Sequence, residues 1–224
     1  MVVQGLERNG VVLRFCEDGR RDAGSTLVFS NSLGTDMRIW MDVARVFQET
    51  MRVVRYDKRG HGMSDAPDAP YTLEDHVDDL DAILEHLKVD NAIVVGVSVG
   101  GMIAQGLALK SPHRVRGLVL CDTAAKIGTS EAWDERIAAI REGGLESIAE
   151  GIMERWFSAG FQDACPAELR LWSNLLVRTP VEGYVGTCAA LSAADMRDQV
   201  GGLDVPTLCI CGDEDGATPP ELVQ

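Results

Sequence analysis

The chain has 224 residues, of which 46% are hydrophobic and 25% are charged, and its formal net charge is −14. This length and composition fit one α/β domain with a sizeable core and do not require two domains. The negative charge argues against nucleic acid and anionic membranes as partners. The N-terminal MVVQGLERNG lacks the pattern of a signal peptide, and no apolar run is long enough to cross a bilayer, so we expect a cytoplasmic protein.

The first half of the chain alternates strand-like and helix-like segments. Apolar, partly β-branched runs predict strands at residues 25–29, 51–57, 91–97 and 116–122. The spacing of apolar residues predicts helices at residues 37–47 and 71–87, and a third helix after residue 101. Strands that are apolar on both faces and separated by helices indicate a mostly parallel sheet with helices on both sides.

Residues 71–87 carry the clearest helix signal. Thr72 is a candidate N-cap, with Asp75 three residues later in a capping-box arrangement. A stripe of Leu and Val residues at steps of three and four predicts one buried face. We expect the opposite, acidic face to place His76 and His86 in solvent.

From residue 125 to residue 200 the pattern changes to helices without strands. One more strand is predicted at residues 206–211, before the acidic loop GDEDGATPP. We interpret the helical stretch as a cap inserted between strands of one fold. The predicted organisation is a core over residues 1–124, a helical cap over 125–200 and a continuation of the core over 201–224.

The segment GVSVGG, residues 96–101, joins a predicted strand to a predicted helix. It contains G-x-S-x-G, with Ser98 at the centre and Gly96 and Gly100 on either side. Between a strand and a helix, this motif is typical of a nucleophile elbow, in which small neighbours permit a tight turn and the helix N-terminus adjoins the serine. An ordinary capping serine is the alternative, but the setting favours a nucleophile.

An acyl-transfer serine needs backbone donors for the oxyanion, a base, and an acid that orients the base. The elbow geometry predicts that the donors are the amide of Val99 and that of Leu33, in the loop SNSLG after the first predicted strand. In this arrangement the acid follows the serine along the chain. The candidates are Asp213, Glu214 and Asp215 after the last predicted strand, and Asp122 after the strand before it.

These segments together resemble the α/β-hydrolases, and among them the 3-oxoadipate enol-lactonases. The resemblance is carried by NSLGTDMRIW, VVRYDKRGHGMSDAP, YTLEDHVDDL, GVSVGGMIAQGLA, RVRGLVLCDTAAKIG, RWFSAGF and CGDEDGATPP. The elbow and RGHGMSD are widespread among α/β-hydrolases, whereas NSLGTD, DTAAKIG and RWF are more particular to the lactonases. The resemblance implies an α/β-hydrolase fold, hydrolysis of a small lactone, and no cofactor or metal. It assigns the acid to Asp215 and a structural role to Asp122.

The resemblance also implies a histidine base after the acid, followed by a closing helix. The chain ends at Gln224, and its four histidines, His61, His76, His86 and His113, all precede Asp215. His61 belongs to the RGHG loop and is expected to be structural. We therefore expect a C-terminal strand, a histidine loop and a helix to be absent from this sequence, and we favour an incomplete chain over a short, inactive protein.

An anionic lactone would need a cation near the serine. The predicted cap offers Arg136, Arg141 and Arg155, and we take Arg136, with Trp133 and Trp156, as the substrate-binding candidates. Packing within the cap is the alternative role for both tryptophans. Two other functions fit the same residues: a carboxylesterase or cofactor-free perhydrolase, and a non-catalytic protein that binds a small ligand. The sequence predicts no oligomeric state.

Overall fold

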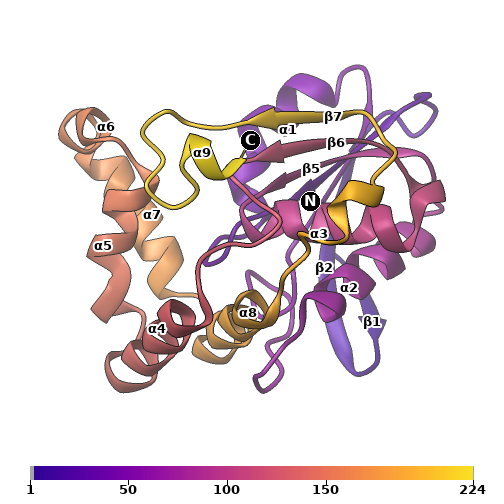
Figure 1. The fold of residues 1–224 in the computed structure, drawn as a ribbon. Coiled ribbons are helices and arrows are strands. Elements are labelled where there is room, and N and C mark those ends of the chain that lie inside the picture. Colours follow the sequence, from indigo (N-terminus) through magenta and orange to yellow (C-terminus); the bar gives the residue numbers. More distant parts are fainter. Residues whose placement is uncertain (1–2, 224) are drawn as a thin grey trace.

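The structure is a computed structural model that describes residues 3–223 (Figure 1). Met1, Val2 and Gln224, which begin and end the predicted core segments, lie outside the described residues. Within that range, seven strands form one sheet in the order β1-β2-β4-β3-β5-β6-β7. The strands are β1 (Gln4–Arg8), β2 (Val11–Gly19), β3 (Thr26–Ser30), β4 (Arg52–Tyr56), β5 (Ala92–Val97), β6 (Val115–Cys121) and β7 (Thr207–Ile210).

The sheet is parallel from β4 through β3, β5 and β6 to β7, as the apolar runs predict. At the other end, β1 and β2 form an antiparallel hairpin, and β2 pairs antiparallel with β4. These two strands are not among those predicted from the apolar runs. Their turn is Asn9–Gly10, and both residues have positive φ, 50° and 80°, which suits the tight turn of a two-residue hairpin.

Helices cover both faces of the sheet. The α-helices of the described residues are α1 (Met41–Phe47), α2 (Leu73–His86), α3 (Val99–Lys110), α4 (Ser130–Gly143), α5 (Glu146–Trp156), α6 (Ala159–Ala164), α7 (Pro166–Val177), α8 (Val181–Ala193) and α9 (Pro220–Val223). α2 and α3 pack against each other on one face, and α1 covers the opposite face beside β4. α4 to α7 lie to one side of the sheet, and α8 packs on α4 and contacts α2 (Figure 1).

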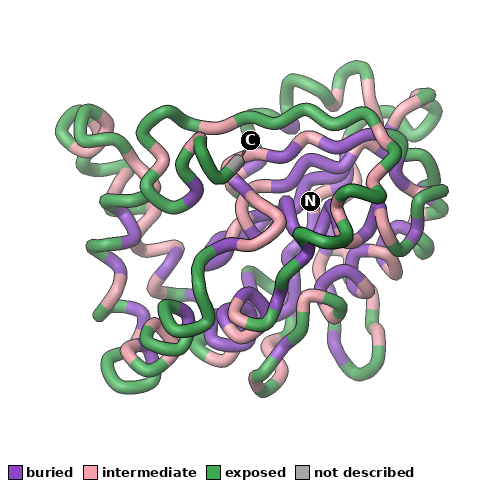
Figure 2. The backbone as a smooth tube through the Cα atoms, in the orientation of Figure 1, coloured by how far each residue is buried: buried purple, intermediate pink, exposed green. Residues whose placement is uncertain are grey.

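The core consists of two apolar clusters, one on each face of the sheet. Val28 and Val94 belong to the cluster that includes Leu80 of α2, whereas Phe29 packs in the other cluster with Trp40. Neighbouring strand residues such as Val28 and Phe29 therefore point to opposite faces, as the alternation of a strand requires. Figure 2 shows β3 buried along its length and the neighbouring central strands mostly buried. This double burial explains why these strands are apolar runs rather than alternating ones.

The structure confirms the capping box at the start of α2 and corrects one expectation about its exposed face. The Thr72 hydroxyl accepts the Asp75 N–H at 3.1 Å, and the Asp75 carboxylate accepts the Thr72 N–H at 2.8 Å. His86 is exposed, but the expectation that His76 is in solvent is wrong, because that residue is only 1% exposed. Its Nε2 lies 3.3 Å from the Thr187 hydroxyl, on the part of α8 that covers this side of α2.

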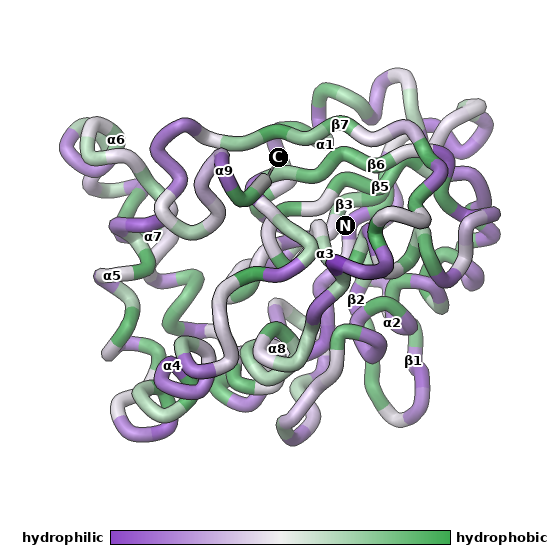
Figure 3. Tube along the Cα trace, in the orientation of Figure 1, coloured by the Kyte–Doolittle hydropathy of each residue, from purple (hydrophilic) through white to green (hydrophobic). Residues whose placement is uncertain are grey.

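The edge strand β7 differs from the other parallel strands. Among the described residues it pairs only with β6, and all of its residues are exposed. Leu208 and Ile210 expose 56% and 48% of their surface. Figures 2 and 3 show this edge to be both exposed and hydrophobic. Within residues 3–223, no helix combines the length and apolar character needed to cross a bilayer.

Candidate active site

Ser98 lies at the turn from β5 into α3 with strained backbone angles. Its φ of 56° and ψ of −123° place it in a region that residues with a side chain rarely adopt. Its N–H donates to the Cys121 carbonyl at 3.1 Å, and its own carbonyl accepts the Gly101 N–H at 2.8 Å and the Thr123 hydroxyl at 2.6 Å. Hydrogen bonds from two directions therefore hold the serine in the strained conformation.

The glycines around Ser98 have no room for a side chain. A Cβ on Gly96 would lie 2.2 Å from the Gly100 carbonyl oxygen, and a Cβ on Gly100 would lie 2.2 Å from the Ser30 carbonyl oxygen. These obstacles are backbone atoms, which cannot turn aside as a side chain can. The two glycines thus allow β5, α3 and the loop after β3 to meet, and this contact brings Ser98 next to residues 31–35.

The two amides expected to form the oxyanion hole are both at this junction. Leu33 and Ser98 line one cavity of about 150 Å³, and Val99 is the first residue of α3. The hydrogen bonds of the described residues include none donated by the amide of Leu33 or of Val99. The neighbouring Gly34 N–H, in contrast, donates to His61 Nε2 at 3.0 Å. The Leu33 and Val99 amides therefore remain the candidate donors for an oxyanion at Ser98.

Asp215 lies in the loop between β7 and α9, and with Ser98 it lines a second cavity of about 450 Å³. One of its oxygens accepts the Ala217 N–H at 2.7 Å, and the other accepts the Thr218 hydroxyl at 2.6 Å. Asp213 and Glu214 line the same cavity but are exposed, whereas Asp215 is half-buried. The structure therefore brings the serine and the expected acid to one cavity.

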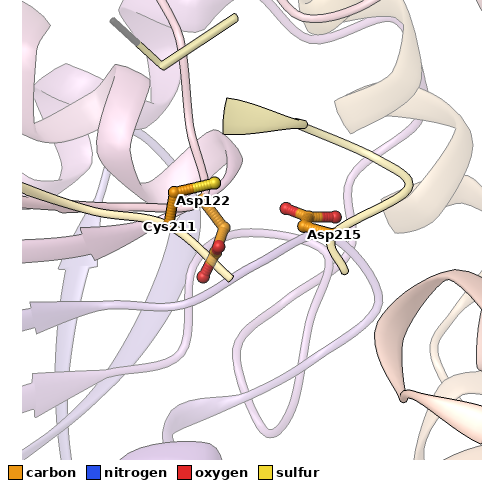
Figure 4. Close-up of side chains that lie close together, drawn as sticks. All are labelled: Asp122, Cys211 and Asp215. Atoms are coloured by element: carbon orange, nitrogen blue, oxygen red, sulfur yellow. The ribbon is translucent and has the colours of Figure 1, made fainter. Parts of the chain in front are cut away.

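Asp122, Cys211 and Asp215 form a cluster beside this cavity (Figure 4). Their ligand-type atoms all lie within 4.8 Å of one another. Asp122 also lines the larger cavity, and its Oδ1 accepts the Gly212 N–H at 2.9 Å, which ties the end of β6 to the acid loop. The Cys211 thiol donates to the Thr218 carbonyl at 3.3 Å, and desolvation and nearby carboxylates raise its pKa.

All four histidines lie among the described residues, and none lines either cavity at Ser98. His61 is buried, with Nε2 accepting the Gly34 N–H and Nδ1 3.1 Å from the Arg59 carbonyl oxygen. Burial, reinforced by a nearby lysine, holds the pKa of His61 well below its ordinary value. Burial also lowers the pKa of His76 to about 3. Both histidines are thus neutral groups that support the fold.

The predicted substrate-binding residues gather on the smaller cavity. Trp133, Arg136 and Trp156 line it together with Ser98. Trp133 is buried, and its indole N–H donates to the Ile127 carbonyl at 2.7 Å. The Arg136 guanidinium lies 4.8 Å from the centre of a Trp133 ring, within the range of a cation–π contact. Trp133 therefore combines a packing role with a place in the cavity wall.

The structure distinguishes Arg136, Arg141 and Arg155, which the sequence alone could not rank as ligands for a substrate carboxylate. Arg136 and Arg155 both line the cavity at Ser98, and Arg155 also lines the larger one. Arg141 instead forms an ion pair with Glu182 and lines neither cavity. Among the described residues, no carboxylate pairs with Arg136 or Arg155. The smaller cavity thus has two guanidiniums without an ion-pair partner in the described part of the chain, which favours an anionic ligand there, whereas the larger cavity also carries Asp213, Glu214 and Asp215.

Two further cavity residues, Tyr184 and Ile152, are not among the candidates predicted from the sequence. Tyr184 of α8 is 1% exposed and lines the smaller cavity, where burial raises the pKa of its phenol while the nearby Arg136 and Arg155 oppose that shift. Ile152 of α5 forms part of the apolar wall. Both residues lie on helices with many apolar positions, so their sequence pattern gives no signal that distinguishes a cavity wall from the core.

Comparison with known proteins agrees with this geometry. Residues 25–163 match a family model described as alpha/beta hydrolase fold. The chain is 38% identical to 3-oxoadipate enol-lactonase 2 of Acinetobacter baylyi and 35% identical to 3-oxoadipate enol-lactonase 1 of that organism, covering 95% and 94% of this chain and 79% of each relative.

A solved structure gives the same result in three dimensions. The crystal structure of the enol-lactonase from Burkholderia xenovorans LB400 superposes with a TM-score of 0.94 at 37% identity, covering 98% of this chain and 85% of that one. The parallel sheet with its elbow, the family model and these relatives all lead to the same conclusion. The chain belongs to the α/β-hydrolase family, as a relative of the 3-oxoadipate enol-lactonases.

Proposed function

We propose that this protein hydrolyses a small enol-lactone that carries a carboxylate, and that the substrate is 3-oxoadipate enol-lactone, which is opened to 3-oxoadipate in the breakdown of aromatic compounds. The observation that carries the proposal is the smaller cavity. It places a serine on a strained elbow next to two arginines without a carboxylate partner. The similarity to enol-lactonases supports the same substrate class.

In the proposed mechanism, Ser98 Oγ attacks the lactone carbonyl and gives up its proton to a base. The negative charge that develops on the carbonyl oxygen is stabilised by the amides of Leu33 and Val99. The ring C–O bond then breaks, and the enolate that leaves takes a proton and tautomerises to a ketone. Water hydrolyses the acyl group from Ser98 and releases the keto acid. No step needs a cofactor.

The base belongs between Ser98 and Asp215, at the larger cavity that both residues line. We propose an imidazole at this position, with Asp215 orienting it and stabilising its cation. His61, His76, His86 and His113 do not line this cavity, so they do not fill the role in this structure. The mechanism therefore predicts that catalysis by the 224-residue chain depends on an imidazole supplied to the cavity.

Chemical rescue tests this mechanism. Hydrolysis of 3-oxoadipate enol-lactone by the chain should be slow and should rise with added imidazole, after subtraction of the imidazole-only rate. Ser98→Ala should abolish the rescued activity, and Asp215→Asn should reduce it. Rescue that persists in Ser98→Ala would contradict the nucleophile. Full activity without imidazole would show that another group is the base.

The substrate class has a separate test in the cap arginines. Arg136→Met and Arg155→Met should each raise KM for the anionic lactone by about tenfold, because a hydrogen-bonded ion pair is lost, and should leave a neutral ester nearly unaffected. Arg141→Met is the matched control, since this arginine lies away from the cavity. Equal effects on the neutral ester and the lactone would point to a carboxylesterase instead.

A further inference from the structure

Lys58 is a fully buried lysine that the proposed mechanism does not use. It follows β4 in the sequence YDKRGHG, and it is 0% exposed. Among the described residues it forms no ion pair with a carboxylate. Its Nζ donates to the Ser32 carbonyl at 2.6 Å and lies 3.4 Å from the Thr35 carbonyl oxygen. A buried lysine aimed at backbone carbonyls is costly, which calls for a specific explanation.

The first of these carbonyls belongs to the same peptide group as the Leu33 amide. This peptide bond is trans, so its C=O and its N–H point in opposite directions. A donor fixed on the Ser32 oxygen therefore aims the Leu33 N–H away from Lys58. Leu33 and Ser32 both line the cavity at Ser98, so the direction of this N–H matters for the oxyanion.

The Ser32 carbonyl also accepts two bonds from Thr35, so Lys58 is one of three donors on this oxygen. The Thr35 N–H and hydroxyl reach the Ser32 oxygen at 3.3 Å and 2.9 Å, which closes the turn. The Gly34 N–H donates to His61 and is thereby withheld from the cavity. Removal of the lysine thus leaves the turn closed, but takes away the shortest donor on the Ser32 carbonyl.

The contact also has an electrostatic effect. A donor on an amide oxygen polarises the peptide group and makes its N–H a stronger donor, and this cooperativity is greatest where water is excluded. Burial lowers the pKa of Lys58 well below its ordinary value, while Asp57 and Asp36 oppose that shift. The Nζ carries N–H groups whether or not it is protonated, so the contact exists in both states.

We propose that Lys58 is a positioning residue for the oxyanion hole: its bond to the Ser32 carbonyl orients and polarises the Leu33 amide toward the oxyanion formed at Ser98. This inference rests on the proposed function, because it requires the Leu33 amide to be an oxyanion donor. A merely structural Lys58 would stabilise the loop without any preference for a tetrahedral adduct over a planar ligand.

Butylboronic acid and glutarate distinguish these two roles. The boronic acid forms a tetrahedral adduct with an active serine and places an oxygen in the oxyanion hole, whereas glutarate offers a carboxylate to the arginines and no electrophile. Lys58→Met should weaken the tetrahedral adduct, measured by boron NMR, by about tenfold, which is less than the loss of a direct oxyanion donor. Glutarate affinity should stay within about twofold.

Lys110→Met is the matched control, because Lys110 pairs with Asp78 on the surface, and it should change neither affinity. Equal weakening of both ligands in Lys58→Met, or no weakening of the boronate, would overturn the proposal. These measurements are made with imidazole present, and if the unsubstituted chain and Ser98→Ala then show the same boron spectrum, the proposed nucleophile fails instead.

A second measurement does not depend on Ser98. In backbone NMR spectra, Lys58→Met should shift the Ser32 carbonyl carbon and the Leu33 amide proton and speed hydrogen exchange at Leu33, while the spectrum elsewhere stays that of a folded protein. An unchanged Leu33 amide in a folded variant would overturn the proposal by itself.

Discussion

The elbow around Ser98 and the loop around Asp215 are held in place by different means. At the elbow, Gly96 and Gly100 meet backbone atoms closely enough to exclude a methyl group, and the sheet and α3 bury both glycines. In the acid loop, most residues are exposed, and Asp215 is held by two short-range bonds, to Ala217 and Thr218. Close packing of the core fixes the nucleophile, whereas local hydrogen bonds at the end of an exposed edge strand fix the acid.

This difference has a consequence for stability. A change at the elbow disturbs contacts among three elements of the core, so its cost should appear in global unfolding. A change in the acid loop affects a segment with few buried contacts, so it should appear mainly as local opening. Three predictions test this comparison, from the largest expected effect to the smallest.

Gly100→Ala should lower the free energy of unfolding by about 3 kcal/mol or more, because the added Cβ would lie 2.2 Å from the Ser30 carbonyl oxygen. Gly151→Ala on α5 is the matched control, since nothing lies within 4 Å of its Cβ position. That variant should gain about 0.5–1 kcal/mol from helix propensity. Urea denaturation measures both values. Similar free energies of unfolding for the two variants would mean that the elbow is not rigidly packed.

A buried histidine of α2, His76, predicts that the free energy of unfolding depends on pH. His76 is buried with a pKa of about 3, so the unfolded chain takes up its proton at a higher pH than the folded chain does. The contribution of His76 to the free energy of unfolding is therefore fully present above the unfolded-state pKa of about 6.5. It is lost as the pH drops below that value, and the loss reaches about 2 kcal/mol at about pH 5.

His76→Gln should remove this part of the pH dependence, as measured by denaturation midpoints at about pH 7.5 and about pH 5. His113→Gln is the control, because His113 has 65% of its side chain exposed. If the change of the denaturation midpoint with pH is the same in His76→Gln, then His76 is protonated or accessible in the folded protein.

Thr218→Val should have the smallest effect on global stability, about 1 kcal/mol or less, because it removes one hydrogen bond to Asp215 while the buried Thr218 side chain keeps its volume. Hydrogen exchange at residues 212–218 should nevertheless become faster, while exchange in β5 and α3 stays unchanged. Thr207→Val, which removes a bond to the Val205 carbonyl, is a control outside the acid loop. Faster exchange throughout the sheet would show that the acid loop is coupled to the core after all.

The sequence predicts the elbow around Ser98 better than the loop around Asp215. The parallel strands are apolar because both faces of the sheet are covered. The glycines flanking Ser98 are required because the backbone around them leaves no room for a side chain. Both features can be recognised in short sequence segments. The hairpin of β1 and β2 is also encoded locally, by the turn Asn9–Gly10, although its strands were not predicted.

The features that the sequence does not reveal depend on distant segments. Arg136 and Arg141 lie five residues apart on α4 and so face different directions, but the packing of α4, α5 and α8 decides that Arg136 and Arg155 line the cavity at Ser98 and that Arg141 pairs with Glu182. His76 shares a helix face with acidic residues, yet α8 covers it. The partner of Lys58 lies 26 residues earlier in the chain, and its proximity follows from the neighbouring positions of β3 and β4 in the sheet.

The most direct test of the account is to trap the nucleophile covalently. The chain is incubated with an alkyl fluorophosphonate in the presence of imidazole, and the adduct is located by intact-protein and peptide mass spectrometry. The account predicts a single adduct on Ser98, formed faster with imidazole than without it and absent from Ser98→Ala. An adduct on another residue, or equal labelling of Ser98→Ala, would contradict the assignment of Ser98 as the nucleophile.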